Sequence, residues 1–223
     1  IRALHDLDTK LTWIHRKTAD ADIYFVLNVR NHPEDLLVNF RIEGKRPELW
    51  YSDLGISKPV SYKMANGFTQ LKLKLGAQES VFVVFKDLEE QKEVELMEKK
   101  PVEILTLAHD WKVNFSENIK EPISLTLDRL VSWSNRPEEG VKFFSGTASY
   151  TIEFDIDQSN VGKNIWLDLG NVKDIATVIV NGKDLATLWK LPYQIDLSKV
   201  IRAGKNNLEI KVTNQWDNRI IGD

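Results

Sequence analysis

Three groups of aromatic and polar side chains in the second half of the chain have the composition of a sugar-binding surface. Aromatic rings stack on the C–H groups of a pyranose, and amide and guanidinium groups hold its hydroxyls. The candidates are Trp133 with Asn135 and Arg136, Trp189 with Tyr193, and Trp216 with Asn218 and Arg219. The alternative for Trp189 and Trp216 is packing in a core or at its rim, because aromatic side chains bury large apolar areas.

Other kinds of site lack their characteristic residues. The chain contains no cysteine, which excludes a disulfide, a thiolate metal site and a thiol nucleophile. The histidines do not have the spacing of zinc ligands; they are His5, His15, His32 and His109. No glycine-rich phosphate loop and no GxSxG motif is present. We therefore predict no cofactor and no metal site.

Composition predicts a globular protein with a packed core. Of the 223 residues 42% are hydrophobic and 28% are charged, which is too apolar for a disordered chain. The net charge of -3 gives no field that would hold a nucleic acid or an anionic membrane surface. No apolar run approaches the roughly 20 residues that span a bilayer. Because the chain starts at Ile1 directly in ordered-looking sequence, we expect a piece excised from a longer polypeptide.

The elements that must position the aromatic groups are predicted to be strands. Residues 174–180 and 183–189 flank Asn181-Gly182, a pair that favours a primed hairpin turn. Residues 148–156 and 208–213 alternate apolar with polar side chains, which is typical of strands with one buried face. A further turn is predicted at residues 204–206, before the last of these strands.

The first half of the chain predicts another set of short strands. They cover residues 11–17, 22–29, 36–42, 47–50, 68–75 and 80–85. Residues 80–85 (SVFVVF) form a continuous apolar run, which is consistent with a central strand buried on both faces. His15-Arg16 ends the first strand, where Arg16 is either an interface residue or part of a surface dipeptide on an edge strand.

A charged segment divides the two sets of strands. Residues 87–100 (DLEEQKEVELMEKK) have few apolar anchors, and we interpret them as a linker. We found no segment with the alternating strands and helices of a parallel α/β fold. The sequence thus predicts an all-β protein of two tandem β-sandwich domains, at residues 1–86 and 101–223.

Several strings resemble a known family. Residues 13–16, 21–28, 48–50 with Gly55, and 80–85 resemble the β-sandwich that follows the catalytic barrel in family 106 glycoside hydrolases, the α-L-rhamnosidases. The second domain is similar to the galactose-binding-like jelly roll of the same enzymes and to the sugar-binding domain of family 2 glycosidases. Its matching strings are residues 143–148, 168–172, 180–183, 188–193 and 214–223, of which the last (NQWDNRIIGD) is the most specific.

The resemblance implies a partner and a location. The catalytic (β/α)₈ barrel of the family is absent from this sequence, so the partner would be the protein's own upstream barrel. The enzymes of this family suggest a periplasmic or extracellular location in a bacterium. Galactose-binding-like folds often hold a structural Ca²⁺, for which Asp155, Asp157 and Asp168 offer oxygens; acidic residues are common in loops, so we do not predict this site.

The same resemblance gives the last residues two interpretations. In related multidomain glycosidases a jelly-roll loop lends polar residues to the substrate pocket, and Asn218, Arg219 and Asp223 would do so here. The competing interpretation is an ion pair between Arg219 and an aspartate that fixes the last loop.

Three hypotheses for function follow. The favoured one is a non-catalytic C-terminal accessory region of an α-L-rhamnosidase-like hydrolase, which supports the barrel and contacts carbohydrate. The alternative is a free-standing glycan- or protein-binding adhesion or scaffold module. A self-contained hydrolase using Asp168 and Asp174 is the third, and glycoside hydrolysis would require two carboxyl groups on either side of one bond.

Overall fold

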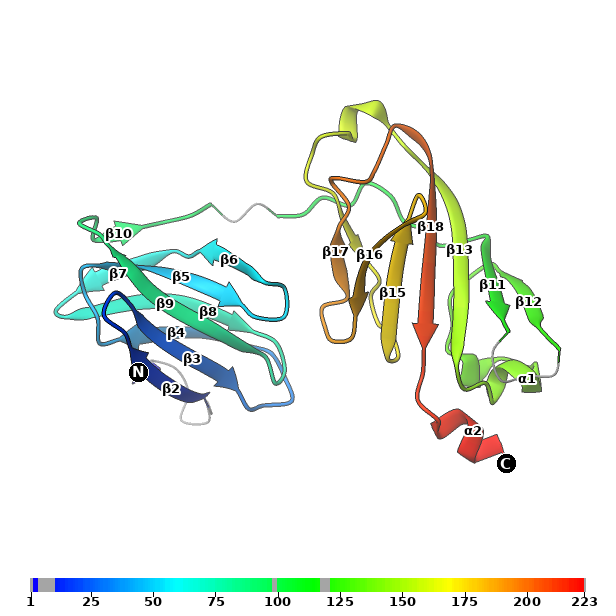
Figure 1. The fold of residues 1–223 in the computed structure, drawn as a ribbon, viewed down its shortest axis with the longest axis horizontal. Helices are drawn as coiled ribbons and strands as arrows, with labels where there is room; N and C mark the ends of the chain where they lie inside the picture. The colour runs from blue at the N-terminus through cyan, green and yellow to red at the C-terminus, as the bar shows by residue number, and fades with distance from the viewer. Residues whose placement is uncertain (1, 4–10, 98–99, 117–120, 223) are drawn as a thin grey trace. The chain divides into compact units, whose positions relative to one another are not determined.

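The protein forms two compact units, Ile1–Pro101 and Val102–Asp223, built mainly from antiparallel strands (Figure 1). The structure, a computed structural model, describes residues 2–3, 11–97, 100–116 and 121–222. Within these residues no helix has the length and apolar character needed to cross a membrane. The predicted all-β fold is confirmed.

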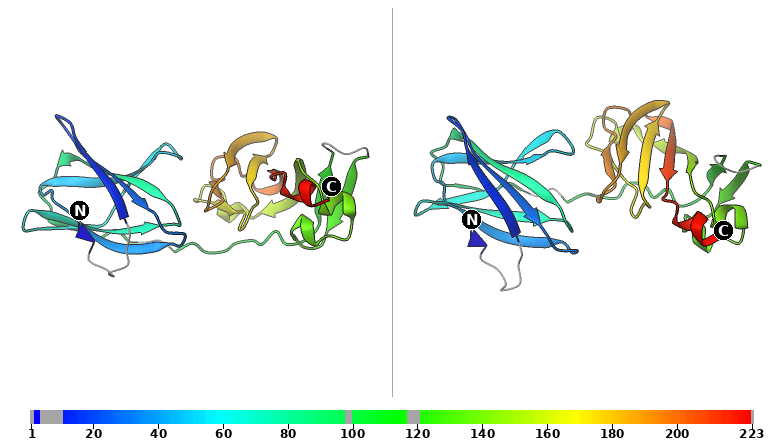
Figure 2. Two further views of the ribbon diagram at one scale, coloured as in Figure 1. Left: turned by 90° about the horizontal axis from the view of Figure 1, so that it is seen from below. Right: turned by 60° about the horizontal axis from the view of Figure 1, so that its bottom comes forward.

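The described residues of the first unit form two five-stranded sheets, which Figures 1 and 2 show as two layers. One sheet has the strand order β1 (Arg2–Ala3), β4 (Glu34–Phe40), β8 (Phe68–Leu75), β7 (Tyr62–Ala65) and β10 (Glu93–Val94). The other has the order β2 (Leu11–Lys17), β3 (Asp22–Asn28), β9 (Ser80–Leu88), β5 (Lys45–Tyr51) and β6 (Ile56–Pro59).

Alternating side chains build the core of this sandwich. In β8 the leucines are buried while Lys72 and Lys74 are exposed, as the alternation in the sequence predicts. The buried cluster consists of Tyr24, Val26, Leu36, Val38, Phe40, Tyr62, Met64, Leu71, Leu73, Leu75, Val81, Val83 and Phe85. These residues come from both sheets, so burying their apolar surface holds the two layers together.

Polar side chains are also buried in the first unit, among them Asn28 and Asp22. The side-chain amide of Asn28 donates to the carbonyl oxygens of His32 (2.9 Å) and Gly76 (2.7 Å), and its oxygen accepts from the backbone N–H of Arg30 (2.9 Å). The carboxylate of Asp22 accepts from Lys45 Nζ at 3.1 Å and lies 3.1 Å from His15 Nε2. Burial opposes ionisation of Asp22, but these hydrogen bonds outweigh it and lower the pKa of the carboxyl.

The described part of the second unit contains a six-stranded and a two-stranded sheet. The larger sheet has the order β12 (Ile123–Leu127), β11 (Trp111–Phe115), β13 (Thr147–Ile156), β18 (Gly204–Thr213), β15 (Ile175–Val180) and β16 (Lys183–Leu188). The smaller sheet pairs β14 (Trp166–Asp168) with β17 (Gln194–Asp196). Short helical segments lie between strands: η1 (Trp133–Asn135), α1 (Glu139–Lys142) and η2 (Gln158–Asn160), and α2 (Asp217–Gly222) follows β18.

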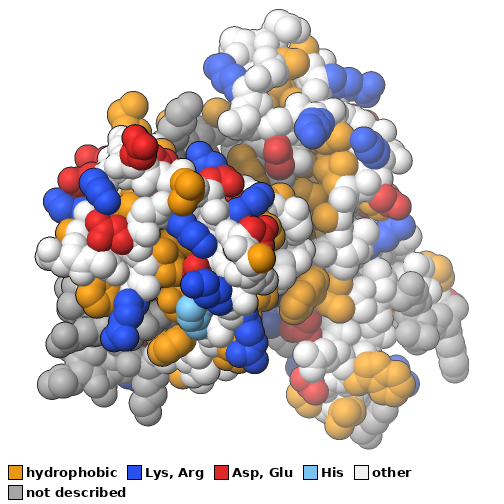
Figure 3. Space-filling model, turned by 60° about the vertical axis from the view of Figure 1, so that its left-hand side comes forward, with side chains coloured by type: hydrophobic (Ala, Val, Ile, Leu, Met, Phe, Trp, Pro, Cys, Tyr) orange, Lys and Arg blue, Asp and Glu red, His pale blue; other side chains and the backbone are white. Residues whose placement is uncertain are grey.

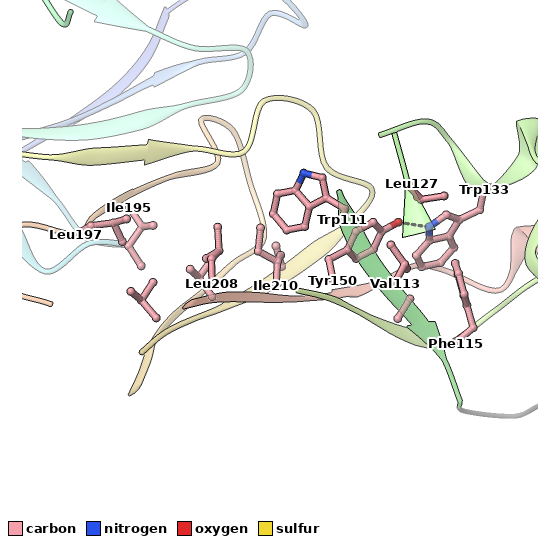
Figure 4. Packing of buried hydrophobic residues seen from close by; sticks show 14 of the residues in the cluster. Trp111, Val113, Phe115, Leu127, Trp133, Tyr150, Ile195, Leu197, Leu208 and Ile210 are labelled. Carbon is pink, nitrogen blue, oxygen red and sulfur yellow. Dashed lines mark hydrogen bonds between the residues drawn. The ribbon is translucent and has the colours of Figure 1, made fainter. Parts of the chain in front are cut away.

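One core lies on one side of the six-stranded sheet. In Figure 4 the labelled side chains of Val113, Tyr150, Leu208 and Ile210 project from the same side of the strands. Side chains of the smaller sheet, such as Ile195, and of the helical segments complete the cluster. On β13 and β18 the opposite side is polar, which agrees with the alternation predicted for residues 148–156 and 208–213.

The predicted hairpin is present as β15 and β16. Asn181 and Gly182 have φ values of 52° and 77°, the positive pair that a type I′ turn requires. The side-chain amide of Asn181 donates to Val200 O (3.0 Å) and Asn206 Oδ1 (2.9 Å), and its oxygen accepts from the N–H of Asn207 (3.0 Å). The hairpin tip is therefore tied to the segment that leads into β18.

Two local predictions differ from the structure. The turn predicted at 204–206 is wrong, because β18 begins at Gly204; the buried side chain of Asn206 closes the preceding loop by donating to Arg202 O and Gly204 O. Part of the predicted linker 87–100 is in the sheets of the first unit, since β9 continues to Leu88 and β10 pairs with β7. Val94 packs against the first core, which explains why the chain stays with this unit. The roles assigned to residues 1–86, 87–100 and 101–223 stay predictions.

Candidate functional site

Trp133, which heads the first predicted sugar-contacting group, lies in the core of the second unit. Its side chain is 8% exposed, and its ring makes edge contacts with Phe115 and Phe144 at centroid distances of 5.3 and 5.4 Å. The indole N–H donates to the hydroxyl of Tyr150, the dashed line in Figure 4. Burial raises the pKa of Tyr150, and this hydrogen bond offsets the rise only in part. A ring enclosed in this way has no face to offer a sugar.

The polar neighbours of Trp133 are on the surface of the η1 loop. Asn135 is exposed, and Arg136 forms two hydrogen bonds with the Glu138 carboxylate, Nε to Oε2 at 3.0 Å and Nη2 to Oε1 at 2.6 Å. The Arg136 contact lowers the pKa of Glu138. The guanidinium is therefore engaged within its own loop. Of this group, Asn135 is the residue whose side-chain amide is exposed at the surface.

The side chains of Trp189 and Tyr193 differ in their exposure to solvent. Trp189 follows β16 and is 63% exposed, whereas Tyr193 is 6% exposed. The Tyr193 hydroxyl donates to the carbonyl oxygen of Asp174 at 2.6 Å, and burial raises its pKa. Tyr193 therefore holds the loop before β15, and of this pair Trp189 presents a ring to solvent.

The third group lies on and beside the short helix α2. Trp216 is 76% exposed, Arg219 is exposed and Asn218 is partly exposed. The backbone N–H of Arg219 bonds to Trp216 O at 3.0 Å, which places Trp216 directly at the start of the helical turn. This is the predicted group whose aromatic ring and polar side chains are accessible together. Asp223 and His5 lie outside the described residues.

Two of the acidic residues considered for Ca²⁺ and for hydrolysis, Asp157 and Asp168, have local hydrogen-bond partners. Asp157 accepts from the N–H of Ser159 at 2.8 Å, while Asp168 accepts from the N–H of Gly170 at 2.8 Å and from Gln194 Nε2 at 2.9 Å. Across residues 2–3, 11–97, 100–116 and 121–222, no group of three or more His, Cys, Asp and Glu side chains could hold a metal ion. The carboxylates of Asp157 and Asp168 therefore fix turns in the structure.

One surface of the first unit was not singled out from the sequence. Cross-strand pairing places Ile14, Phe25, Phe82 and Trp50 side by side across β2, β3, β9 and β5. We call the side of the sheet that carries this row the outer face, because it is opposite the core. The sequence contained a signal for it, since residues 80–85 read as a strand buried on both faces. Figure 3, which turns the first unit forward, shows hydrophobic side chains reaching the surface among Lys and Arg side chains.

Comparison with known proteins agrees with the predicted resemblance. Residues 1–64 match the family model of the α-L-rhamnosidases, glycoside hydrolase family 106. Residues 133–220 match the galactose-binding domain-like model of glycosyl hydrolase family 2. The predicted resemblance to the β-sandwich and galactose-binding-like region of family 106 enzymes is thus confirmed.

Two individual proteins share larger parts of the chain. The solved structure of a rhamnosidase from Novosphingobium sp. PP1Y is similar over 98% of this chain, with 38% sequence identity and a TM-score of 0.91. A protein of Formosa agariphila named "Putative beta-glucuronidase" is 45% identical over 121 residues, which are 53% of this chain. The chain spans 21% of the rhamnosidase and 10% of the Formosa protein.

Proposed function

We propose that this chain is a non-catalytic accessory region of a glycoside hydrolase that resembles α-L-rhamnosidases, and that it supports the catalytic barrel of that enzyme. The observation that carries the proposal is the similarity to a rhamnosidase over 98% of this chain and only 21% of the other. The same fold occurs at 38% identity as one part of a much longer enzyme. We therefore infer that this chain also acts as one part of a longer enzyme.

The chemistry of the described residues supports a non-catalytic role. Hydrolysis of a glycosidic bond requires two carboxyl groups about 5 Å or more apart across the bond. Asp168 is engaged with Gly170 and Gln194, and Asp174 lies in the loop that Tyr193 fixes through a backbone contact. The strands around these residues are antiparallel, in contrast to the parallel barrel that carries catalysis in the family we predicted.

The first test is an activity assay of the chain itself. We expect no hydrolysis of 4-nitrophenyl α-L-rhamnoside above the buffer rate. A chimera in which this chain replaces the matched region of the Novosphingobium rhamnosidase is expected to be soluble and to hydrolyse the same compound. Turnover by the isolated chain would contradict the non-catalytic role, and a chimera that is folded but inactive would contradict the supporting role.

Contact with carbohydrate is the finer part of the proposal, and α2 is the place for it. Trp216 presents an exposed ring next to Asn218 and Arg219, the combination that stacks on a sugar and binds its hydroxyls. An open surface of this kind buries little of a ligand, so we expect dissociation constants of about 1 mM or weaker.

Titration calorimetry of the chimera with rhamnose and with pectic oligosaccharides tests this contact. Trp216→Ala is expected to abolish the measured heat of binding at the accessory region, while Trp166→Ala, a matched change at a 51% exposed tryptophan of β14, leaves it unchanged. Binding that survives Trp216→Ala would show that α2 is not the contact surface.

A further inference from the structure

The outer face of the first unit carries a row of four apolar side chains and, next to it, a row with an apolar pair at its centre. The first row is Ile14, Phe25, Phe82 and Trp50, one from each of four neighbouring strands. In the next row Ile23 and Val84 are paired, with Arg16 and Glu48 on either side. Because side chains directly opposite each other on antiparallel strands share a face, both rows lie on the same side of the sheet.

These residues lie outside the buried cluster between the two sheets, although Val84 is itself only 2% exposed. The buried cluster of the first unit takes the alternate residues of the same strands, Tyr24 and Val26 from β3 and Val81, Val83 and Phe85 from β9. On the outer face Ile14 is 49% exposed and Trp50 is 41% exposed. The rings of Phe25 and Phe82 contact each other with centroids 5.1 Å apart. This sheet is therefore apolar on both sides.

The outer sides of the other large sheets differ from this face. On β4 and β8 the outward pairs include Asp35 with Lys74 and Asn39 with Gln70. The six-stranded sheet of the second unit carries a row of polar side chains on the side opposite its core, which are Ser124, Asn114, Ser149, Lys211, Thr177 and Thr187. An antiparallel sheet exposed to water normally has such a polar side, so the apolar outer face is a local feature of this sheet.

The border of the outer face is polar. Trp50 Nε1 donates to Glu48 Oε2 at 2.8 Å, Arg46 pairs with Asp87 at 2.8 Å, and Arg16 is exposed. An apolar centre with aromatic residues, surrounded by hydrogen-bonded charged residues, is the usual composition of a protein–protein interface. Phe25 and Phe82 form the centre of the row, and Trp50 at its end is of a residue type that often dominates binding energy.

We propose that the outer face is the surface on which the catalytic domain of the same polypeptide packs. The inference rests on the proposed function, because the rhamnosidase that matches 98% of this chain is about five times as long as the matched region. A barrel is surrounded by amphipathic helices, and an aliphatic helix surface packs well on a flat aromatic row. Arg16 lies at the border of this face, which supports the first of its two interpretations, an interface residue, over a surface dipeptide on an edge strand.

Crosslinking in the chimera with the Novosphingobium rhamnosidase tests the contact. The photoreactive residue p-benzoyl-L-phenylalanine is placed at position 82, and in a control protein at position 68. Phe68 is a matched control because it is a 38% exposed phenylalanine at the start of β8, in the other sheet. We expect position 82 to crosslink to rhamnosidase residues outside the replaced region, and position 68 to give no such product.

A second variant measures the energetic effect. Phe82→Ser leaves the core unchanged but removes the contact with Phe25, so we expect the melting temperature of the first unit in the isolated chain to fall by only a few degrees. In the chimera the same change is expected to lower the fraction of active enzyme after mild heating by about tenfold. Phe68→Ser is expected to have little effect in either protein.

Each outcome decides the question. Crosslinks from position 82 to a second copy, or to residues 102–222 of this chain, would overturn the inference. An active chimera that shows no crosslink and tolerates Phe82→Ser would overturn it too, while leaving the proposed function intact. An inactive or insoluble chimera would contradict the proposed function, and the inference would fall with it.

Discussion

Replacing Trp133 with alanine is expected to destabilise the second unit strongly. The substitution removes a nearly buried indole that contacts Phe115 and Phe144 and leaves the hydroxyl of Tyr150 without its donor. Truncation of a buried aromatic side chain to alanine costs about 3–5 kcal/mol. In a unit of this size such a loss lowers the melting temperature by roughly 10–20 °C.

Differential scanning calorimetry of the whole chain is the suitable measurement. The two units have separate cores, so we expect two transitions and a shift in one of them. Trp133→Phe keeps most of the ring contacts and loses the hydrogen bond, for which we expect a smaller loss of about 1–3 kcal/mol. Trp216→Ala is the control, because a side chain that is 76% exposed contributes less than about 0.5 kcal/mol.

One result would refute this reasoning. If Trp133→Ala left both transitions within about 1 °C of the wild type, the indole could not be a core residue. If the same variant also lost binding to a rhamnose-containing oligosaccharide, the original interpretation of Trp133 as a sugar contact would be restored.

Three further predictions concern the first unit and the hairpin. The pKa of Asp22 is lowered in the folded state, so its contribution to stability is present above the unfolded pKa near 3.8 and is lost as the pH falls through the folded pKa. Asp22→Asn, which weakens the contacts with Lys45 and His15, should flatten this acid dependence of the melting temperature, and an unchanged pH profile would argue against the pair. Asn28→Ala removes three hydrogen bonds from buried groups and should cost about 3 kcal/mol by urea unfolding of the first unit; a loss below about 1 kcal/mol would mean that water replaces them. Gly182→Ala forces a Cβ onto a residue with φ of 77° and should cost about 1 kcal/mol in the transition of the second unit, and equal stability would contradict the I′ turn.

The strands could be predicted because the alternation of side chains is a local property. Residues 148–156 and 208–213 show a clean period of two, and the same strands pair as β13 and β18 in the structure. The Asn181-Gly182 turn was predictable for the same reason, since the positive φ values depend on these two residues alone. The short helices η1 and α1 were not, because three or four residues carry no helical period.

Burial of individual aromatic residues could not be derived from the sequence. Trp133 stands among serines, Asn135 and Arg136, a composition typical of a surface loop. The Trp133 side chain is held in the core by contacts with Phe115, Phe144 and Tyr150. All three lie more than ten residues from it in the sequence, so the local composition around Trp133 does not reveal them. Trp216 also has polar neighbours but is exposed, so composition did not separate the two.

The hydrogen bonds around Asn181 also bear on how the protein ages chemically. Asparagine followed by glycine is prone to deamidation, in which the next backbone nitrogen attacks the side-chain amide, because glycine offers no steric protection. The amide of Asn181 is fixed by Val200, Asn206 and Asn207, whereas the side chain of Asn66, in the other Asn-Gly turn, is exposed. During long storage at alkaline pH, isoaspartate should therefore accumulate at the β7–β8 turn while the β15–β16 turn keeps its asparagine.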